Sequence, residues 1–137
     1  MAACARTLRQ SLFLGDIIVN LRAPILLTHA MLPLLEKGSR PIVMHVSSIA
    51  ALSIPAGQSV YSASKAAVTA FSHALRKEWN PRGIRVTVIH SAGVSTWNAP
   101  EPYKLLRPED VGRLIHFILA ADRNCQIDEV ALSALGG

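Results

Sequence analysis

The chain has 137 residues, a hydrophobic fraction of 50% and a formal net charge of +5. It is long enough for one domain with a single core, predicted to occupy 1–137, and it is too apolar to be disordered. Its longest apolar runs, such as 24–27 and 115–121, fall far short of the ~20 residues that cross a bilayer, which excludes a transmembrane protein and any membrane partner. Its cations are scattered and only 5% of its residues are aromatic, so the charge indicates a mildly basic surface and no nucleic-acid partner.

The first predicted elements are a helix and a short buried strand. Apolar residues recur at helical spacing from 16 to 35, and Pro24 is expected to bend that helix or to limit its regular part. The run PIVMHV at 41–46 is typical of a buried strand, and a polar loop that contains Ser48 follows it. The preceding residues, 1–15, form an N-terminal extension of unclear role.

The rest of the chain predicts two more helices and two more strands. In chain order they are a helix at 60–79, a strand at 84–89 (IRVTVI), a helix at 108–121 and a strand at 126–132 (QIDEVAL). Strands separated by helices of this length form parallel units with right-handed crossovers, so the predicted fold class is α/β, with a three-stranded parallel sheet covered by helices. Ligands bind where loops leave the carboxyl ends of such strands, which directs attention to the loops that begin at Ser47 and His90.

Cysteine and histidine usage bears on location and on metal binding. Cys4 and Cys125 are too few and too far apart for a disulfide framework or a cysteine-ligated zinc site, and free thiols fit the reducing cytoplasm. The five histidines show no metal-ligand spacing, and the two in or beside strands are expected to be satisfied core imidazoles. The first fifteen residues resemble the start of a mitochondrial presequence but lack a small-residue cleavage signature, so a cytoplasmic location is expected.

One pair of residues on the second helix suggests acid–base chemistry. Tyr61 and Lys65 stand four residues apart, so their side chains project from one face of the helix. A phenol is a poor acid–base catalyst until its anion is stabilised, which a lysine ammonium one turn away does by charge attraction. Ser48 leaves the preceding strand thirteen residues before Tyr61, so the loop can let both hydroxyls converge on one substrate oxygen. An isolated pair of this kind is common by chance. In the non-catalytic interpretation, Tyr61 merely caps the helix and Lys65 is a solvated surface cation.

The surroundings of this pair resemble a known family. The segment VYSASKAA at 60–67, preceded by VMHVSS at 43–48, is similar to the catalytic segment of the short-chain dehydrogenases/reductases. The stretch GIRVTVI at 83–89 is similar to the next strand of that family, and Asn20 lies where the family carries its active-site asparagine. The resemblance covers nearly the whole chain from about residue 16. It implies a Rossmann-like, doubly wound parallel sheet, truncated to about three parallel strands with flanking helices.

The resemblance implies a role for each matched residue. Tyr61 is the general acid that protonates a carbonyl oxygen during reduction, or the base during oxidation of an alcohol. Lys65 stabilises the phenolate and binds the nicotinamide ribose, while Ser48 hydrogen-bonds the substrate oxygen. Asn20 would hold a water in a proton relay to Lys65, or it is a buried helix amide bonded to a backbone carbonyl. The implied cofactor is NAD or NADP, and the implied substrate is a small carbonyl compound or secondary alcohol.

Two features depart from the family pattern. Where the family has Pro-Gly and then a threonine that holds the nicotinamide carboxamide, this chain reads SAGVST at 91–96, so Val94 and Thr96 keep their places as candidate cofactor contacts. Trp97 and Tyr103 lie where the family places its substrate lid. The eight glycines include no closely spaced set after a strand, so the glycine-rich turn that receives the pyrophosphate has no counterpart. The chain therefore resembles the C-terminal half of such an enzyme.

This departure leaves two functions open. In the family the strand at 41–46 is paired on its other side, so here it is expected to form an apolar edge, and apolar helix faces are expected to be exposed. The helices at 16–35 and 60–79 resemble those of the family's four-helix dimer interface and predict a homodimer. The chain is expected to be an NAD(P)-dependent oxidoreductase; the alternative is a catalytically inactive fragment that dimerises or binds a partner.

Overall fold

Three parallel strands form one sheet in the computed structural model, which describes residues 10–95 and 104–135. The strands lie in the order β1 (Ile42–Ser48), β2 (Arg85–Ser91) and β3 (Glu129–Leu132). The central strand is β2, whose first six residues are all buried. The predicted α/β fold with a three-stranded parallel sheet is confirmed, and β1 lies at an edge of the described sheet, as expected.

The strands differ from their predicted bounds where pairing continues or stops. β1 runs past 46 because Ser47 and Ser48 still pair with β2. β3 begins at 129 rather than 126, because its ladder with β2 begins only there. The two serines that the sequence placed in a loop are therefore held by the sheet.

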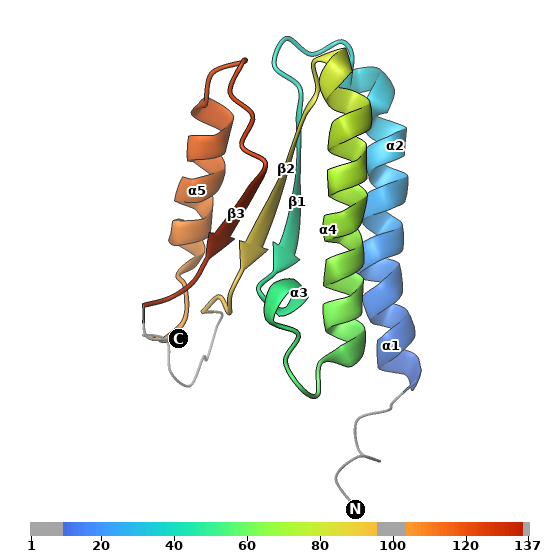
Figure 1. The fold of residues 1–137 in the computed structure, drawn as a ribbon, viewed down its shortest axis with the longest axis vertical. Helices are drawn as coiled ribbons and strands as arrows, with labels where there is room; N and C mark the ends of the chain where they lie inside the picture. Colours follow the sequence, from blue (N-terminus) through green and yellow to red (C-terminus); the bar gives the residue numbers. More distant parts are fainter. Residues whose placement is uncertain (1–9, 96–103, 136–137) are drawn as a thin grey trace, which may run out of the picture.

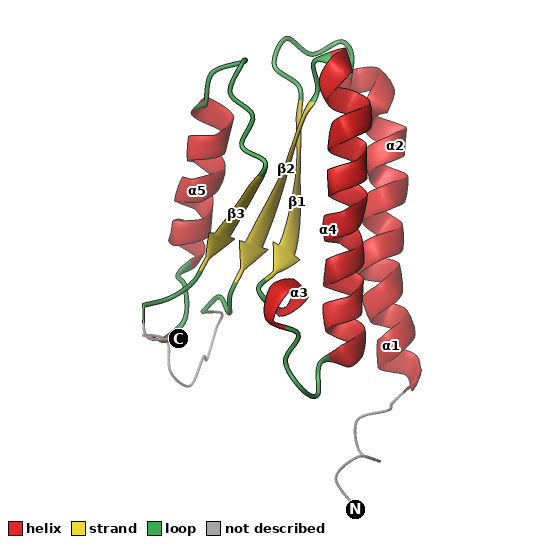
Figure 2. Cartoon of the chain, in the orientation of Figure 1, coloured by secondary structure: helices red, strands yellow, loops and turns green. Residues whose placement is uncertain are grey.

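Helices cover the two faces of the sheet unequally (Figures 1 and 2). The N-terminal helix and α4 (Ser59–Trp79) lie on one face, and α5 (Pro108–Ala120) lies on the other. Two short segments flank α4, namely α3 (Ala50–Ser53) before it and η3 (Asn80–Arg82) after it. α4 and α5 both begin and end within one residue of their predicted bounds. Pro108 marks the start of α5 and the turn after Trp79 marks the end of α4, and both signals are local.

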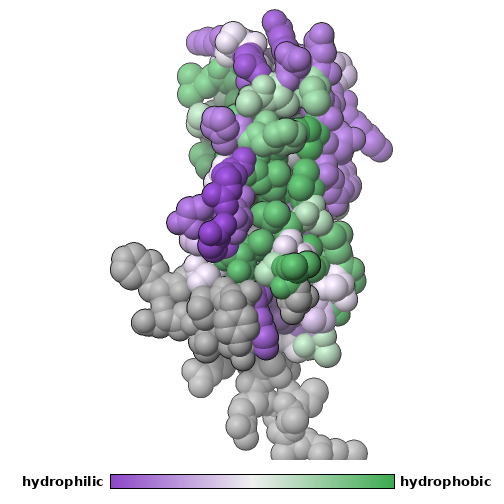
Figure 3. Space-filling model, turned by 90° about the vertical axis from the view of Figure 1, so that its left-hand side faces the viewer, coloured by the Kyte–Doolittle hydropathy of each residue, from purple (hydrophilic) through white to green (hydrophobic). Residues whose placement is uncertain are grey.

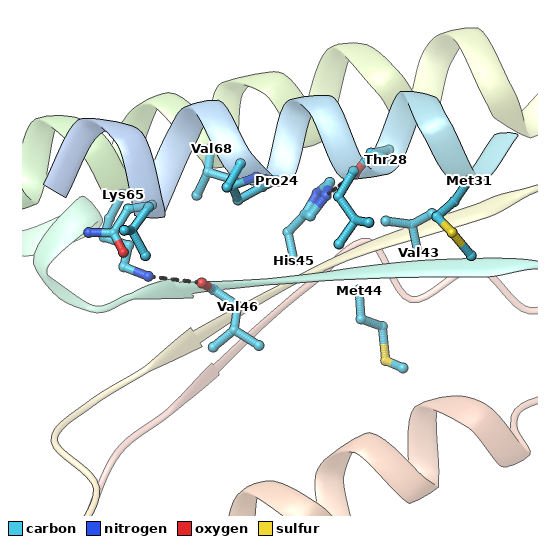
Figure 4. Close-up of a pocket in the computed structure, with 13 residues that line it drawn as sticks. Pro24, Thr28, Met31, Val43, Met44, His45, Val46, Lys65 and Val68 are labelled. Atoms are coloured by element: carbon cyan, nitrogen blue, oxygen red, sulfur yellow. Dashed lines mark hydrogen bonds between the residues drawn. The ribbon is translucent and has the colours of Figure 1, made fainter. Parts of the chain in front are cut away.

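The sheet face under α5 is only partly covered. The side of the molecule that carries α5 shows a band of apolar surface between hydrophilic flanks (Figure 3). Val46 of β1 points toward this side (Figure 4) and is 47% exposed. Phe117 and Leu119 of α5 are exposed as well. One helix of thirteen residues leaves apolar side chains of this layer in solvent, which confirms the expected exposure of apolar faces.

The N-terminal helix begins earlier than predicted and consists of three consecutive segments. α1 (Gln10–Ile17) passes into a π-helical segment, η2 (Ile18–Arg22), which passes into α2 (Ala23–Leu35). Pro24 stands in the first turn of α2 and lacks the N–H that would otherwise bond the carbonyl of Asn20. The wider turn of η2 lies directly before this proline, so Pro24 limits the regular part of the helix as predicted.

The same helix removes the run-length argument against a membrane-spanning segment. Residues 14–35 form a helix of 22 residues whose mean hydropathy reaches 1.5 over 18 residues, which is long and apolar enough to cross a bilayer by length and composition. A search for uninterrupted apolar runs does not find this helix, because Asp16, Asn20 and Arg22 interrupt the run. They do not lower its mean hydropathy enough to exclude a membrane span. The core helix of a water-soluble protein, which is mostly buried, passes the same test, whereas only 6% of this window is buried inside the described chain.

The main core cluster lies between α4 and the sheet. It comprises four buried side chains, Leu75, Trp79, Ile84 and Val86. Leu75 and Trp79 stand one turn apart on α4, so helical periodicity turns both toward the sheet. Gly83 adopts a φ of 77°, a left-handed conformation that glycine takes without strain, and it lets the chain turn from α4 into β2.

Small buried serines let α4 approach its neighbours closely. Ser64 and Ser72 return their hydroxyl hydrogens to carbonyls of the preceding turn, at 2.7 Å to Tyr61 and 2.6 Å to Val68. Such bonds satisfy a polar side chain inside a helix. The hydroxyl of Ser62 is buried and has no hydrogen-bond partner among the described residues, which costs free energy.

This contrast predicts opposite outcomes for two serine-to-alanine variants. Ser62→Ala is expected to leave the free energy of unfolding unchanged or to raise it by up to ~1 kcal/mol, because it removes an unpaired hydroxyl and improves helix propensity. Ser72→Ala is expected to cost about 1–3 kcal/mol, because it removes the acceptor 2.7 Å from Nδ1 of buried His45. Urea denaturation measures both, and equal losses in the two variants would contradict this account.

Candidate active site

Ser48 lies where the sheet ends. It is the last residue of β1, it is buried, and its hydroxyl oxygen accepts the N–H of Ala50 in α3 at 3.1 Å. The next residue, Ile49, donates its N–H to the carbonyl of Ser91 at the end of β2, also at 3.1 Å. The loops after β1 and β2 therefore leave the sheet at one edge, as predicted, and Ser48 is held there from two sides.

Tyr61 and Lys65 lie on successive turns near the start of α4. Nζ of Lys65 is 5.8 Å from the centre of the Tyr61 ring, and both side chains are half-buried. The predicted proximity of the two groups is confirmed. The hydroxyls of Ser48 and Tyr61 form no hydrogen bond with each other in the described chain, so their convergence on one substrate oxygen stays a prediction.

The amine of Lys65 meets the open edge of β1. Its Nζ donates to the carbonyl of Val46 at 3.1 Å (Figure 4). Backbone groups of the odd-numbered Pro41 and Ile49 bond to the β2 side, so by alternation those of Val46 point to the open edge. Burial lowers the pKa of Lys65, and the negative charge of Asp16 opposes this shift.

Asn20 joins the N-terminal helix to α4 beside Lys65. It lies in η2, and its side-chain N–H groups donate to Ser64 Oγ at 3.3 Å and to Asp16 Oδ1 at 3.4 Å. Ser64 is the neighbour of Lys65 in the sequence, so Asn20 faces the predicted site through side-chain bonds rather than a backbone carbonyl. Asp16 is a site residue outside the predicted set, although its four-residue spacing from Asn20 on one helix is a signal that points to it.

A groove of about 540 Å³ runs along the open edge of β1. The N-terminal helix forms one wall and β1 forms the other, with Lys65 at one end (Figure 4). Most of its lining is apolar, and its polar lining residues are Asn20, Thr28, His45 and Lys65. Two of the four predicted catalytic residues therefore line this groove, and the other two do not.

His45 is a buried histidine with a closed set of hydrogen bonds. Ser72 gives its own hydrogen to a backbone carbonyl, so its oxygen accepts the Nδ1–H of His45 at 2.7 Å. Nε2 then accepts the hydroxyl hydrogen of Thr28 at 3.0 Å, which leaves the ring neutral. Burial lowers the pKa of His45 accordingly. The expectation of a satisfied core imidazole is confirmed here.

The loop after β2 carries the predicted cofactor contacts. Val94 is half-buried and forms an isolated parallel bridge with Leu106, whose N–H donates to the carbonyl of Gly93 at 2.9 Å. This bridge ties the loop to the segment that leads into α5. Thr96, the other candidate cofactor contact of this loop, lies outside the described residues, as do Trp97 and Tyr103 of the expected substrate lid.

The sequence motif and the fold agree with one family. The family model described as short chain dehydrogenase matches residues 5–103, which is well over half of the chain. The chain belongs to the short-chain dehydrogenase/reductase family.

Relatives within the short-chain dehydrogenase/reductase family are about twice as long. An uncharacterized oxidoreductase of Staphylococcus aureus (strain MRSA252) is 26% identical over 119 residues, covering 83% of this chain and 51% of the relative. Dehydrogenase/reductase SDR family member 4 of Pongo abelii is 32% identical over 120 residues, covering 76% of this chain and 43% of that relative. The solved structure of a short chain dehydrogenase from Burkholderia cenocepacia J2315 in complex with NADP gives a TM-score of 0.74 at 25% identity. The match covers 84% of this chain and 52% of that protein. The chain thus spans about half the length of the proteins it matches.

The contribution of His45 to stability is expected to fall as the pH is lowered from 7 to 5. Because burial lowers the pKa of His45 below its ordinary value of 6.5, the unfolded chain binds this proton more readily than the folded chain. The contribution of neutral His45 to the free energy of unfolding is therefore complete above pH 6.5 and is lost as the pH falls below that value. Urea midpoints at the two pH values measure it.

A matched pair of variants isolates His45. His45→Gln is expected to lose part of the pH dependence, whereas His116→Gln, which replaces an exposed histidine of α5, is expected to retain it. The same slope in both variants would show that another group is responsible.

Proposed function

We propose that the chain carries the acid–base centre of an NAD(P)-dependent oxidoreductase that interconverts a carbonyl compound and a secondary alcohol. The observation that carries the proposal is the amine of Lys65 lying 5.8 Å from the centre of the Tyr61 ring. Membership of the short-chain dehydrogenase/reductase family supports it, because it makes a chance pairing a poor explanation. The position of Ser48 at the carboxyl edge of the sheet supports it as well.

Each side chain has a defined part in the proton chemistry. Tyr61 donates its phenolic proton to the carbonyl oxygen during reduction and takes a proton back during oxidation. The positive charge of Lys65 favours the phenolate that remains. Because Ser48 Oγ already accepts the N–H of Ala50, its own O–H can point to the substrate oxygen and stabilise charge that develops there.

NAD or NADP is the proposed cofactor, and it supplies or accepts the hydride. The phenol of Tyr61 and the ammonium of Lys65, on one face of α4, suit the adjacent hydroxyls of a ribose. Val94 and Thr96 would hold the nicotinamide end from the loop after β2. The likeness to an NADP-bound dehydrogenase supports this cofactor class. These residues fit the nicotinamide end of the cofactor, whereas the glycine spacing offers no turn for its pyrophosphate.

Lys65 can serve both the fold and the cofactor. Its ammonium group has three donors, of which one is used by the carbonyl of Val46. Two donors remain for a ribose hydroxyl and for a water. Asn20, bonded to the hydroxyl of Ser64 next to Lys65, is proposed to hold that water in a relay that returns protons to Tyr61.

Removal of one hydroxyl tests the chemistry. Tyr61→Phe is expected to lower kcat for reduction of ketones or aldehydes by at least ~10²-fold, the usual contribution of a general acid. It is expected to leave the Kd for the reduced cofactor little changed, because Lys65 remains. Fluorescence titration with NADH and NADPH measures binding, and absorbance of the reduced nicotinamide measures turnover.

A serine pair provides the matched control. Ser48→Ala is expected to slow turnover, whereas Ser53→Ala is not, because the Ser53 hydroxyl is exposed and donates to the carbonyl of Ile49. The proposal fails if the chain binds neither cofactor at millimolar concentration, or if Tyr61→Phe turns over at the original rate.

Partner binding is a second candidate function, and exposed apolar side chains favour it. Leu26 and Leu34 of α2 are 52% and 61% exposed and stand eight residues apart, which places them on one face of the helix. Solvated apolar faces of this kind mark protein interfaces. We propose that the helices at 16–35 and 60–79 form a homodimer interface.

Light scattering after gel filtration tests this proposal. The chain is expected to be dimeric, and Leu34→Glu is expected to make it monomeric, because the charge would be buried at the interface. Phe117→Glu replaces an equally exposed side chain on α5 and is expected to keep the dimer. A monomeric parent chain would show that there is no dimer interface. Dissociation only in Phe117→Glu would place the interface at α5.

A further inference from the structure

His90 is a fully buried histidine whose two ring nitrogens both face oxygen acceptors. It lies in the central strand β2, and its side chain is 0% exposed. Nδ1 is 3.2 Å from the carbonyl oxygen of Ser48 in β1, and Nε2 is hydrogen-bonded to a carboxylate oxygen of Glu129 in β3. The ring therefore links all three strands at the edge where Ser48 leaves the sheet.

The proton count at this ring follows from hydrogen-bond chemistry. A carbonyl oxygen accepts and cannot donate, so Nδ1 must carry a hydrogen to bond Ser48. The contact between Nε2 and Glu129 needs a second hydrogen between the two atoms. A neutral imidazole beside an ionised carboxylate supplies only one of these hydrogens. The pair of His90 and Glu129 therefore holds one proton more than that neutral arrangement.

The surroundings place this proton on the ring. The second oxygen of Glu129 accepts a hydrogen bond from Nε2 of His73 in α4 at 2.9 Å. Desolvation raises the pKa of Glu129, but the hydrogen bonds from His90 and His73 outweigh it and lower the pKa overall. Arg76, the nearby cation of α4, is occupied by Asp128 and by backbone carbonyls. Glu129 is thus the anion that faces His90.

We propose that His90 is a positioning residue for Ser48, held as a doubly protonated imidazolium between the Ser48 carbonyl and the Glu129 carboxylate. Its role deepens the proposed function and rests on it, because Ser48 is the group whose position matters to the chemistry. Loss of either ring hydrogen breaks one of the two bonds. His45 is the contrast on the neighbouring strand, since its partners are hydroxyls that can donate as well as accept, and its ring is neutral.

Nitrogen-15 NMR of the histidine rings in the whole chain tests the protonation state directly. At pH 7 His90 is expected to show two protonated ring nitrogens, each correlated with its own hydrogen. His45 is expected to show one protonated and one bare nitrogen in the same spectrum. His90→Gln assigns the signals by their disappearance. A bare nitrogen on His90 at pH 7 would overturn the proposal.

A matched pair of carboxylate variants tests the link to Ser48. Glu129→Gln keeps the shape and removes the charge, and it is expected to remove one ring hydrogen of His90 at pH 7. Hydrogen exchange of the Ala50 amide, which bonds Ser48 Oγ, is expected to speed up severalfold in that variant. Asp128→Asn removes the neighbouring charge and is expected to change neither readout.

The outcomes separate this proposal from the proposed function. If His90 keeps both hydrogens in Glu129→Gln, Glu129 does not hold the proton. If Ala50 exchange is the same in both variants, His90 does not position Ser48. None of these measurements uses a cofactor or turnover, so an inactive chain with an imidazolium at His90 would refute only the oxidoreductase proposal.

Discussion

The open edge of β1 is the constraint on which the candidate site depends. The carbonyl of Val46 faces a largely apolar groove, where a backbone acceptor without a donor costs free energy. Lys65 supplies the donor at 3.1 Å, which draws its amine to the end of the strand. The same side chain lies over the ring of Tyr61. The placement of Lys65 over Tyr61 and the hydrogen bond that satisfies the sheet edge are therefore one arrangement.

Polar contacts along α4 fix its position on β1 and keep that arrangement in register. Ser47 donates to the carbonyl of Lys65 at 2.9 Å and accepts from Thr69 at 3.0 Å, which locks the helix to the strand beside the site. Two turns further along, Ser72 bonds His45. Buried polar groups of this kind specify one packing because each must find its partner, whereas apolar packing alone tolerates small shifts.

The two strand histidines show how neighbouring atoms decide protonation. His45 sits between hydroxyls, which adapt to a neutral ring, and burial lowers its pKa. His90 sits between a carbonyl and a carboxylate, which only accept. Two imidazoles on adjacent strands therefore meet opposite kinds of partner in one small sheet: His45 ties β1 to α2 and α4, and His90 ties the Ser48 carbonyl to β3.

The sequence by itself determined the elements and the local part of the site. Helical periodicity, the proline at 108 and the turn after Trp79 set α4 and α5 almost to the residue, because these signals act within a few residues. The four-residue spacing of Tyr61 and Lys65 placed both on one helix face for the same reason. The predicted bounds differ at the end of β1, which continues to Ser48 because strand pairing continues there, and at the start of the N-terminal helix, which begins at Gln10.

Only the tertiary structure decided which distant groups meet. Lys65 reaches Val46 across 19 positions, Asn20 reaches Ser64 across 44, and His90 reaches Glu129 across 39. No local pattern encodes such contacts, since they depend on the spacing and angle at which helices and strands pack. Periodicity predicts which face of a helix or strand is buried. Which residues pack against that face depends on the whole fold.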